Sequence, residues 1–157
     1  NLWIETEKEA LIELLGEVDG LILNDDEARQ FTEKHNLIDA ADWIRDQGAT
    51  YCIIKKAEHG AMFVGPEGIF ALPGYPTDRV QDPTGAGDSF AGGFLGAAAS
   101  MDAPMDTAFR HGLAYGTVVA SFTIEDFGTG PIAGLSRDAV DSRLEQYLAM
   151  TQLPDRS

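Results

Sequence analysis

The stretch Asp82-Pro83-Thr84-Gly85-Ala86-Gly87-Asp88-Ser89-Phe90-Ala91-Gly92-Gly93-Phe94-Leu95-Gly96 is the part of the sequence that decides the fold. It begins as a turn, because Asp-Pro and Thr-Gly disfavour a helix and glycine permits positive φ angles. It continues as a helix over residues 88–100, since the residues after Asp88 are small or apolar. A glycine-rich loop that enters a helix offers free N–H groups and the positive end of the helix dipole, so the pattern predicts an anion site.

Asp88 adds a second chemical feature to this loop. A carboxylate is a poor choice for holding an anion, but it suits a base that takes a proton from a hydroxyl attacking that anion. The plainer interpretation is a glycine turn in which Asp88 is the N-cap of the helix. The further glycines at positions 85, 87, 92 and 93 make the run less generic than a simple cap and favour a phosphoryl-transfer site.

The composition limits the classes of partner. The 157 residues suit one domain, and a hydrophobic content of 44% is enough for a core. The formal net charge of −15 disfavours nucleic acids and anionic membranes as partners. An enzyme of ATP with this charge needs local cations and a metal ion, and the candidate cations are Lys55, Lys56 and Arg79.

The single cysteine and the first residues bear on the compartment. Cys52 stands alone, which excludes an intrachain disulfide and a cysteine metal cluster, and its apolar strand context predicts a buried thiol. No run of about 18 apolar residues predicts a membrane span. The start, Asn1-Leu2-Trp3-Ile4, has neither Met nor a signal-peptide pattern, so we expect a cytoplasmic protein whose chain begins within a longer polypeptide.

Predicted strands and helices alternate, which indicates an α/β fold with a Rossmann-like, mostly parallel sheet flanked by helices. The predicted strands are residues 20–24 and 50–55, followed by a small hairpin of residues 60–64 and 68–72. The predicted helices, besides 88–100, are residues 7–17, 37–47, 105–123 and 136–149, with a further helix opening after residue 24. We expect Thr6 to open a capping box, Asn36 and Gly48 to cap the helix 37–47, and Ser136 to cap the last helix. Residues 127–134 are predicted to be a glycine loop.

Asn24-Asp25-Asp26-Glu27 follows the first predicted strand and permits two interpretations. One is a capping box, with Asn24 as N-cap and Glu27 at N3. The other is a polar cluster at the carboxyl end of a strand, where open α/β sheets bind ligands and where three carboxylates could hold a hydrated Mg²⁺. Both can hold at once. The small residues Gly112 and Gly116 likewise permit close helix packing or the approach of a flat ligand.

Several other kinds of site do not fit the spacing. The chain has no Gly-x-x-x-x-Gly-Lys-Ser/Thr loop, and its three histidines lack metal-ligand spacing. Ser89 lacks the Gly-x-Ser-x-Gly context of a serine hydrolase.

Residues 82–90 resemble the C-terminal signature of the ribokinase-like (PfkB) carbohydrate and nucleoside kinases. Asn24-x-x-Glu27 resembles the Asn-x-x-Glu motif of that family, and Lys55-Lys56-Ala57-Glu58-His59-Gly60-Ala61 resembles its nucleotide-binding strand and loop, although many members have glycine where Ala57 stands. The order of elements agrees over nearly the whole chain. The resemblance implies that residues 1–157 are the C-terminal part of a single ribokinase-like domain of about twice this length, with the N-terminal half absent.

The resemblance also implies roles for residues of the glycine-rich loop. Asp88 would be the base that deprotonates the acceptor hydroxyl. The backbone N–H groups of Gly85, Ala86, Gly87 and Asp88 would stabilise the transferred phosphoryl group. Asp82, Thr84 and the loop around Gly128 would bind a monovalent cation such as K⁺.

The remaining implied roles concern the nucleotide. Asn24 and Glu27 would arrange Mg²⁺ and its waters around the phosphates of ATP, and Lys55 and Gly60 would lie along the nucleotide. The residues implied at the adenine are Gly112, Tyr115 and Gly116.

The function expected from these motifs is ATP-dependent transfer of the γ-phosphate to a hydroxyl of a sugar or nucleoside. The alternative is a non-catalytic nucleotide-binding module, or an inactive fragment, derived from such a kinase. Members of the family often dimerise, so a homodimer is compatible with the resemblance.

Overall fold

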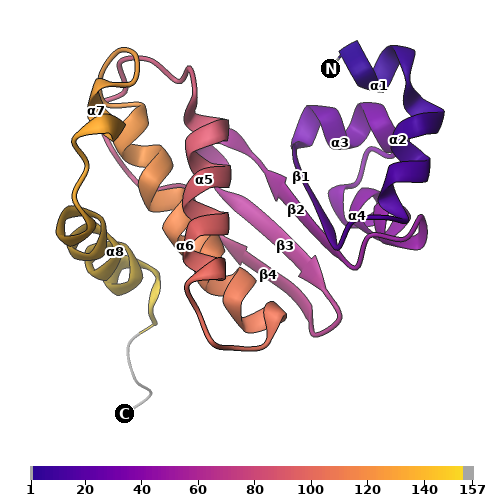
Figure 1. Cartoon of the computed structure of the whole chain (residues 1–157). Helices are drawn as coiled ribbons and strands as arrows, with labels where there is room; N and C mark the ends of the chain where they lie inside the picture. Colours follow the sequence, from indigo (N-terminus) through magenta and orange to yellow (C-terminus); the bar gives the residue numbers. More distant parts are fainter. Residues whose placement is uncertain (1, 154–157) are drawn as a thin grey trace. The chain divides into compact units, whose positions relative to one another are not determined.

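The computed structural model describes residues 2–153, which divide into two compact units. Unit 1 is Asn1–Ala71 and unit 2 is Leu72–Ser157. By these ranges, unit 1 contains the helices α1 to α4 and the sheet up to Ala71, and unit 2 contains the helices α5 to α8, which are labelled in Figure 1. Within residues 2–153, no helix is both long and apolar enough to cross a membrane.

The sheet consists of β1 (Gly20–Asn24), β2 (Tyr51–Lys55), β3 (Ala61–Gly65) and β4 (Gly68–Leu72), in the order β1-β2-β3-β4. β1 and β2 are parallel, whereas β2 and β3 are antiparallel. Residues 56–60 join β2 to β3, and this connection is too short for the crossover that a parallel pair needs. The predicted α/β class and hairpin are confirmed, but the sheet of the described residues is mixed rather than mostly parallel.

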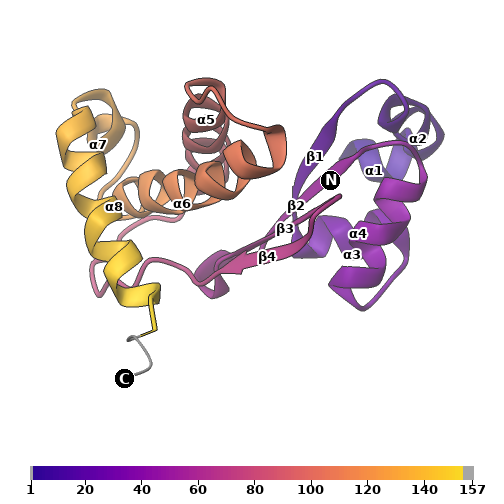
Figure 2. The same ribbon diagram turned by 90° about the horizontal axis from the view of Figure 1, so that it is seen from below.

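The core of unit 1 lies between its helices and one face of the sheet (Figure 2). The helices are α1 (Leu2–Thr6), α2 (Lys8–Leu15), α3 (Asp25–Thr32) and α4 (Leu37–Asp46). Leu15, Phe31 and Ile44 from the helices pack with Cys52 and Ile54 of β2. Cys52 is buried, so the predicted buried thiol is confirmed. This burial raises the pKa of the Cys52 thiol to about 12.

Two of the predicted helix ends in unit 1 are wrong. The Thr6 hydroxyl donates a hydrogen bond to the Leu2 carbonyl (3.0 Å) inside α1, and α2 begins at Lys8 without a side-chain cap. A threonine inside a helix can bond the carbonyl four residues earlier, and here this bond replaces the predicted capping box. At the end of α4 the C-cap is Gln47 rather than Gly48, whereas Asn36 caps its start as predicted by accepting from the Ile38 N–H (2.8 Å).

Unit 2 is built on a pair of antiparallel helices, α5 (Ala86–Ala99) and α6 (Met105–Thr123). α8 (Arg137–Thr151) packs on α6 through a cluster that includes Val118, Val140 and the fully buried Tyr147. Ser136 caps α8 as predicted, and its hydroxyl accepts from the Ala139 N–H. The predicted glycine loop contains one short helix, α7 (Gly130–Ala133), because Pro131 suits the first turn of a helix.

Glycines bring the backbones of α5 and α6 close together. A Cβ atom on Gly116 would lie 2.8 Å from the Phe90 carbonyl oxygen, and one on Gly112 would lie 2.8 Å from the Phe94 carbonyl oxygen. Real Cβ atoms do not approach a backbone atom this closely, so a side chain at either position would force the helices apart. Close helix packing therefore accounts for both glycines.

We predict that Gly116→Ala lowers the free energy of unfolding by about 1–3 kcal/mol, because its methyl group overpacks the contact between α5 and α6. The control is Gly96→Ala, on α5, where a Cβ atom would have no neighbour within 4 Å. Replacing this glycine within a helix should raise stability by about 0.5–1 kcal/mol. Denaturant unfolding followed by far-UV circular dichroism measures both changes, and equal effects of the two substitutions would contradict the prediction.

Candidate functional site

The first group of predicted site residues lies at the carboxyl edge of β1 and β2. The parallel register pairs Asn24, the last residue of β1, with Lys55, the last residue of β2. α3 begins directly after Asn24, so Glu27 lies in its first turn. Three of the predicted residues thus occupy one edge of the sheet in unit 1.

Asn24 and Glu27 form a complete capping box. The Asn24 Oδ1 atom accepts a hydrogen bond from the Glu27 N–H (2.7 Å), and the Glu27 Oε2 atom accepts one from the Asn24 N–H (2.8 Å). The predicted cap is confirmed, and it fixes both side chains at the end of the strand. Because the cap uses Oε2, the chemistry that Glu27 offers to a metal or its waters is that of Oε1.

Asp25 and Asp26, which lie between Asn24 and Glu27 in the sequence, both lie close to Arg29. Arg29 Nη1 lies 2.7 Å from Asp25 Oδ2 and 3.5 Å from Asp26 Oδ1. The hydrogen bond from Arg29 holds the pKa of Asp25 below its usual range. Among residues 2–153 there is no group of three or more His, Cys, Asp or Glu residues placed to hold a metal ion, so the three carboxylates considered from the sequence do not form a joint site.

The turn after β2 is tight. The Lys56 N–H donates to the Gly60 carbonyl (2.7 Å), which closes the turn around the short 3₁₀ helix Ala57–His59. Ala57 has a φ of +48°, a left-handed conformation that costs a residue with a Cβ atom about 1–2 kcal/mol. The backbone at position 57 therefore has a left-handed conformation that glycine adopts without strain. The chain keeps this conformation although it has alanine where many members of the family it resembles have glycine.

The second group lies in unit 2, at the start of α5. Asp82 Oδ1 accepts a hydrogen bond from the Thr84 N–H (2.9 Å), and the hydrogen bonds from Thr84 hold the pKa of Asp82 below its usual range. Gly85, with a φ of +80°, is the N-cap of α5. The helix therefore begins two residues before the predicted start at residue 88. Asp88 lies in its first turn rather than at the N-cap, so the plainer interpretation of Asp88 is wrong.

The N–H groups of this first turn differ in their partners. The Ala86 N–H donates to the Pro83 carbonyl (3.2 Å). The N–H groups of Gly87 and Asp88 belong to the first turn, where no carbonyl of the preceding helical turn exists to accept them. The Asp88 side chain is exposed. The start of α5 thus carries backbone donors and an accessible carboxylate on consecutive residues.

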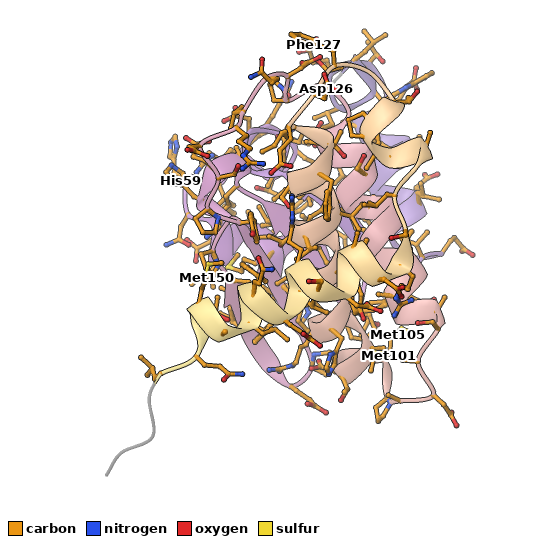
Figure 3. All side chains as sticks on the ribbon, turned by 90° about the vertical axis from the view of Figure 1, so that its left-hand side faces the viewer. His59, Met101, Met105, Asp126, Phe127 and Met150 are labelled. Atoms are coloured by element: carbon orange, nitrogen blue, oxygen red, sulfur yellow. The ribbon has the colours of Figure 1, made fainter. Side chains whose placement is uncertain are left out.

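The loop after α6 lies next to the beginning of the glycine-rich stretch. The N–H groups of Gln81 and Asp82 both donate to the Ile124 carbonyl, at 2.8 and 3.3 Å. Gly128, with a φ of +70°, is exposed on the same loop. Figure 3 shows Asp126 and Phe127 pointing outward at this end of unit 2. The pairing with Ile124 brings Asp82 to the loop that the resemblance implied, four residues before Gly128.

The three residues implied at the adenine have partners within the fold. Gly112 and Gly116 lie in the contact between α5 and α6. The Tyr115 hydroxyl donates to Asp141 Oδ1 (3.0 Å), and the Arg137 guanidinium lies 5.1 Å from the centre of the Tyr115 ring. These contacts account for the three residues without a nucleotide, and their role at the adenine stays a prediction.

Comparison with known proteins gives one family. The sequence model described as "pfkB family carbohydrate kinase" matches residues 2–133. The cytidine kinase of Thermococcus kodakarensis is 36% identical over 110 residues, which cover 68% of this chain and 38% of that protein. The chain therefore spans well under half the length of this relative.

Solved structures with the ribokinase fold resemble the chain. The aminoimidazole riboside kinase of Salmonella enterica, solved with aminoimidazole riboside and an ATP analogue, matches with a TM-score of 0.77 and 24% identity over 89% of this chain and 46% of that one. A fructokinase of Vibrio cholerae, solved with fructose, ADP and a potassium ion, matches with a TM-score of 0.77 and 17% identity over 87% and 44% of the two chains. The predicted ribokinase-like fold class is confirmed.

We predict that Ala57→Gly raises the free energy of unfolding of unit 1 by about 0.5–1 kcal/mol, because relief of the left-handed strain exceeds the added entropy of the unfolded chain. The control is Ala71→Gly on β4, at an exposed position without a positive φ. This substitution should lower the free energy of unfolding by about 0.5–1 kcal/mol. Both tryptophans, Trp3 and Trp43, lie in unit 1, so their fluorescence during urea unfolding measures the change. A loss of stability in Ala57→Gly would contradict the strained turn.

Proposed function

Because the chain belongs to the pfkB family of carbohydrate kinases, we propose that it takes part in the ATP-dependent transfer of a γ-phosphate to a hydroxyl of a sugar or nucleoside. The observation that carries the proposal is the start of α5, where the left-handed Gly85 opens a helix whose first turn holds the exposed Asp88. Anion donors and a candidate base therefore stand on consecutive residues. The relative from Thermococcus kodakarensis is a cytidine kinase, which supports a small hydroxyl compound as the acceptor.

In the proposed reaction, the Asp88 carboxylate takes the proton of the acceptor hydroxyl as its oxygen attacks the γ-phosphorus. The bond from phosphorus to the bridging oxygen breaks, and ADP leaves. The N–H groups at residues 85–88 stabilise the charge on the phosphoryl oxygens, and one such donor is typically worth about 2.7–4 kcal/mol. Since the Ala86 N–H already donates to Pro83, we assign most of this effect to Gly87 and Asp88.

Mg²⁺ fits the edge of the sheet in unit 1 through its waters. It keeps several waters in proteins and needs few direct ligands, and Asn24 and Glu27 offer oxygen atoms held in place by the capping box. Bound there, the ion would neutralise charge on the phosphates. We further propose that Lys55 and Gly60 lie along the nucleotide, and that Gly112, Tyr115 and Gly116 border the adenine.

A monovalent cation is proposed beside the glycine-rich loop. Asp82 offers carboxylate oxygens, one of which accepts the Thr84 N–H, and Thr84 and the loop of Gly128 offer further oxygens. Oxygen donors are those that hard cations prefer. The potassium ion in the fructokinase of Vibrio cholerae supports K⁺ as the ion to test first.

One observation favours the alternative of a non-catalytic nucleotide-binding module or inactive fragment. The matched region covers only 38% of the cytidine kinase, so residues that bind an acceptor in that protein need not have counterparts here. Calorimetric titration with Mg-ATP, combined with a coupled kinase assay over sugars and nucleosides, separates the two. Binding without turnover favours the module. That residues 1–157 form the C-terminal part of one kinase domain stays a prediction, as does a homodimer.

We predict that Asp88→Asn abolishes turnover while ATP binding stays within about twofold, because the amide keeps the size of the side chain but cannot accept the proton. The matched control is Asp102→Asn, because Asp102 is exposed in the loop between α5 and α6. This substitution should leave both turnover and ATP binding unchanged. A coupled assay and calorimetry measure the two quantities. Turnover retained by Asp88→Asn would rule out Asp88 as the base.

We predict that Gly87→Val weakens binding of Mg-ATP at least about tenfold, because a branched side chain in the first turn blocks the approach of phosphate to the N–H groups. The control is Gly92→Val, further along α5, where a Cβ atom would have no neighbour within 4 Å. Calorimetric titration measures binding. If Gly87→Val bound ATP as tightly as Gly92→Val, the first turn of α5 would serve the fold alone.

A further inference from the structure

The C-terminal helix α8 reaches the glycine-rich loop through the end of α6. We propose that Arg143 on α8 is a positioning residue, which holds the last turn of α6 and thereby the loop that carries Asp82, Gly85 and Asp88. The importance of this loop rests on the proposed function. Arg143 lies beyond residue 133, where the match to the family ends, so none of the motifs discussed above includes it.

Arg143 makes three hydrogen bonds at the C-terminal end of α6, one to Ser121 in its last turn and two to Glu125, the residue after its C-cap Ile124. Its Nη1 atom donates to Ser121 Oγ (3.0 Å), and its Nη1 and Nη2 atoms donate to the two carboxylate oxygens of Glu125 (3.1 Å each). Its guanidinium also lies 3.5 Å from the centre of the Phe122 ring. The side chains of Arg143 and Glu125 are only 17% and 20% exposed, so the two-pronged pair is shielded from solvent screening.

The same end of α6, at its C-cap Ile124, holds the glycine-rich loop. The Ile124 carbonyl, next to Glu125, accepts the N–H groups of Gln81 and Asp82. A carbonyl at the end of a helix has no partner within the helix, so the loop supplies the hydrogen bonds that this carbonyl lacks. Thr123 faces Gly85, since a Cβ atom on Gly85 would lie 3.8 Å from the Thr123 methyl group.

The segment that leads into the loop touches the same pair. The Arg143 guanidinium lies 5.1 Å from the centre of the Tyr75 ring, and the Thr77 hydroxyl lies 3.4 Å from Glu125 Oε1. An open pocket of about 860 Å³ lies beside this segment and α8, and its lining includes Tyr75, Arg79, Glu125 and Arg143. Tyr147 of α8 also contacts this segment, because its hydroxyl donates to the Pro73 carbonyl and its ring centre lies 6.0 Å from that of Tyr75. Arg143 adds a charged link from α8 to Ser121 and Glu125 at the end of α6.

The test is amide hydrogen exchange, measured by NMR on the full chain. Arg143→Ala should speed exchange of the Gln81 and Asp82 N–H groups by about tenfold or more, because the helix end that accepts them loses its support. Exchange at Leu113 and Val118, in the body of α6, should change by less than about threefold. Equal acceleration at all four positions, or none at Gln81 and Asp82, would overturn the proposal, because Arg143 would then contribute only to overall stability or not at all.

The matched control is Arg137→Ala on the same helix. Arg137 forms an ion pair with Asp141 and lies over the Tyr115 ring, but it does not contact the last turn of α6. This substitution should leave exchange at Gln81 and Asp82 within about threefold of the unmodified chain. Arg143→Lys should give an intermediate result, since lysine keeps the charge but cannot form two parallel hydrogen bonds with Glu125.

A kinetic measurement separates this proposal from the proposed function. In a kinase assay, Arg143→Ala should lower kcat while KM for ATP changes little, since misplaced donors stabilise the transition state less. If the unmodified chain shows no turnover with any acceptor, the proposed function fails, while the exchange experiment still decides the role of Arg143. If kcat is unchanged although exchange at Gln81 and Asp82 is faster, the loop moves without effect on the reaction and the positioning role is wrong.

Discussion

The close contact between α5 and α6 is the constraint on which the rest of unit 2 depends. Because Gly112 and Gly116 have no side chain, the backbone of α6 contacts the carbonyl groups of Phe94 and Phe90 on α5 directly. Because the helices are antiparallel, this contact places the first turn of α5 beside the last turn of α6. That neighbourhood explains why a single carbonyl, that of Ile124, can accept two N–H groups from the loop before α5. The candidate anion site is therefore positioned by helix packing rather than by the loop alone.

At the edge of the sheet in unit 1, the structural and functional interpretations concern the same atoms. Asn24 and Glu27 satisfy free N–H groups at the start of α3, and the same bonds hold their side chains in fixed orientations. An amide and a carboxylate fixed at the carboxyl end of a strand need little reordering to bind a hydrated ion. The neighbouring Asp25 and Asp26 differ, because Arg29 partly neutralises both of them. The capping box therefore favours Glu27 over the two aspartates as a residue for Mg²⁺.

Local features were predicted well from the sequence, whereas contacts between distant residues were not. The caps by Asn24, Asn36 and Ser136 depend on atoms within three residues, and all three are present. The cap by Thr6 failed, since a competing bond to the fourth residue before it was available. The antiparallel β3 was predictable from the short connection at residues 56–60. The pairing of Arg143 with Glu125 joins residues 18 positions apart on two helices, and no periodicity or motif in the sequence indicates it.

The acidic composition explains why backbone donors matter in this chain. Most ion pairs of the described residues combine an arginine or lysine with a carboxylate, as in Arg29 with Asp25 and Arg143 with Glu125, so these cations are already neutralised. Lys55, Lys56 and Arg79, the cations named from the sequence, form no salt bridge within residues 2–153, so no carboxylate there neutralises them. With a net charge of −15, three side chains cannot offset the general repulsion of ATP. Backbone donors such as the N–H groups of α5 act only at close range. Unlike the charge of a lysine or arginine side chain, they are not neutralised by an ion pair with a carboxylate of the same chain.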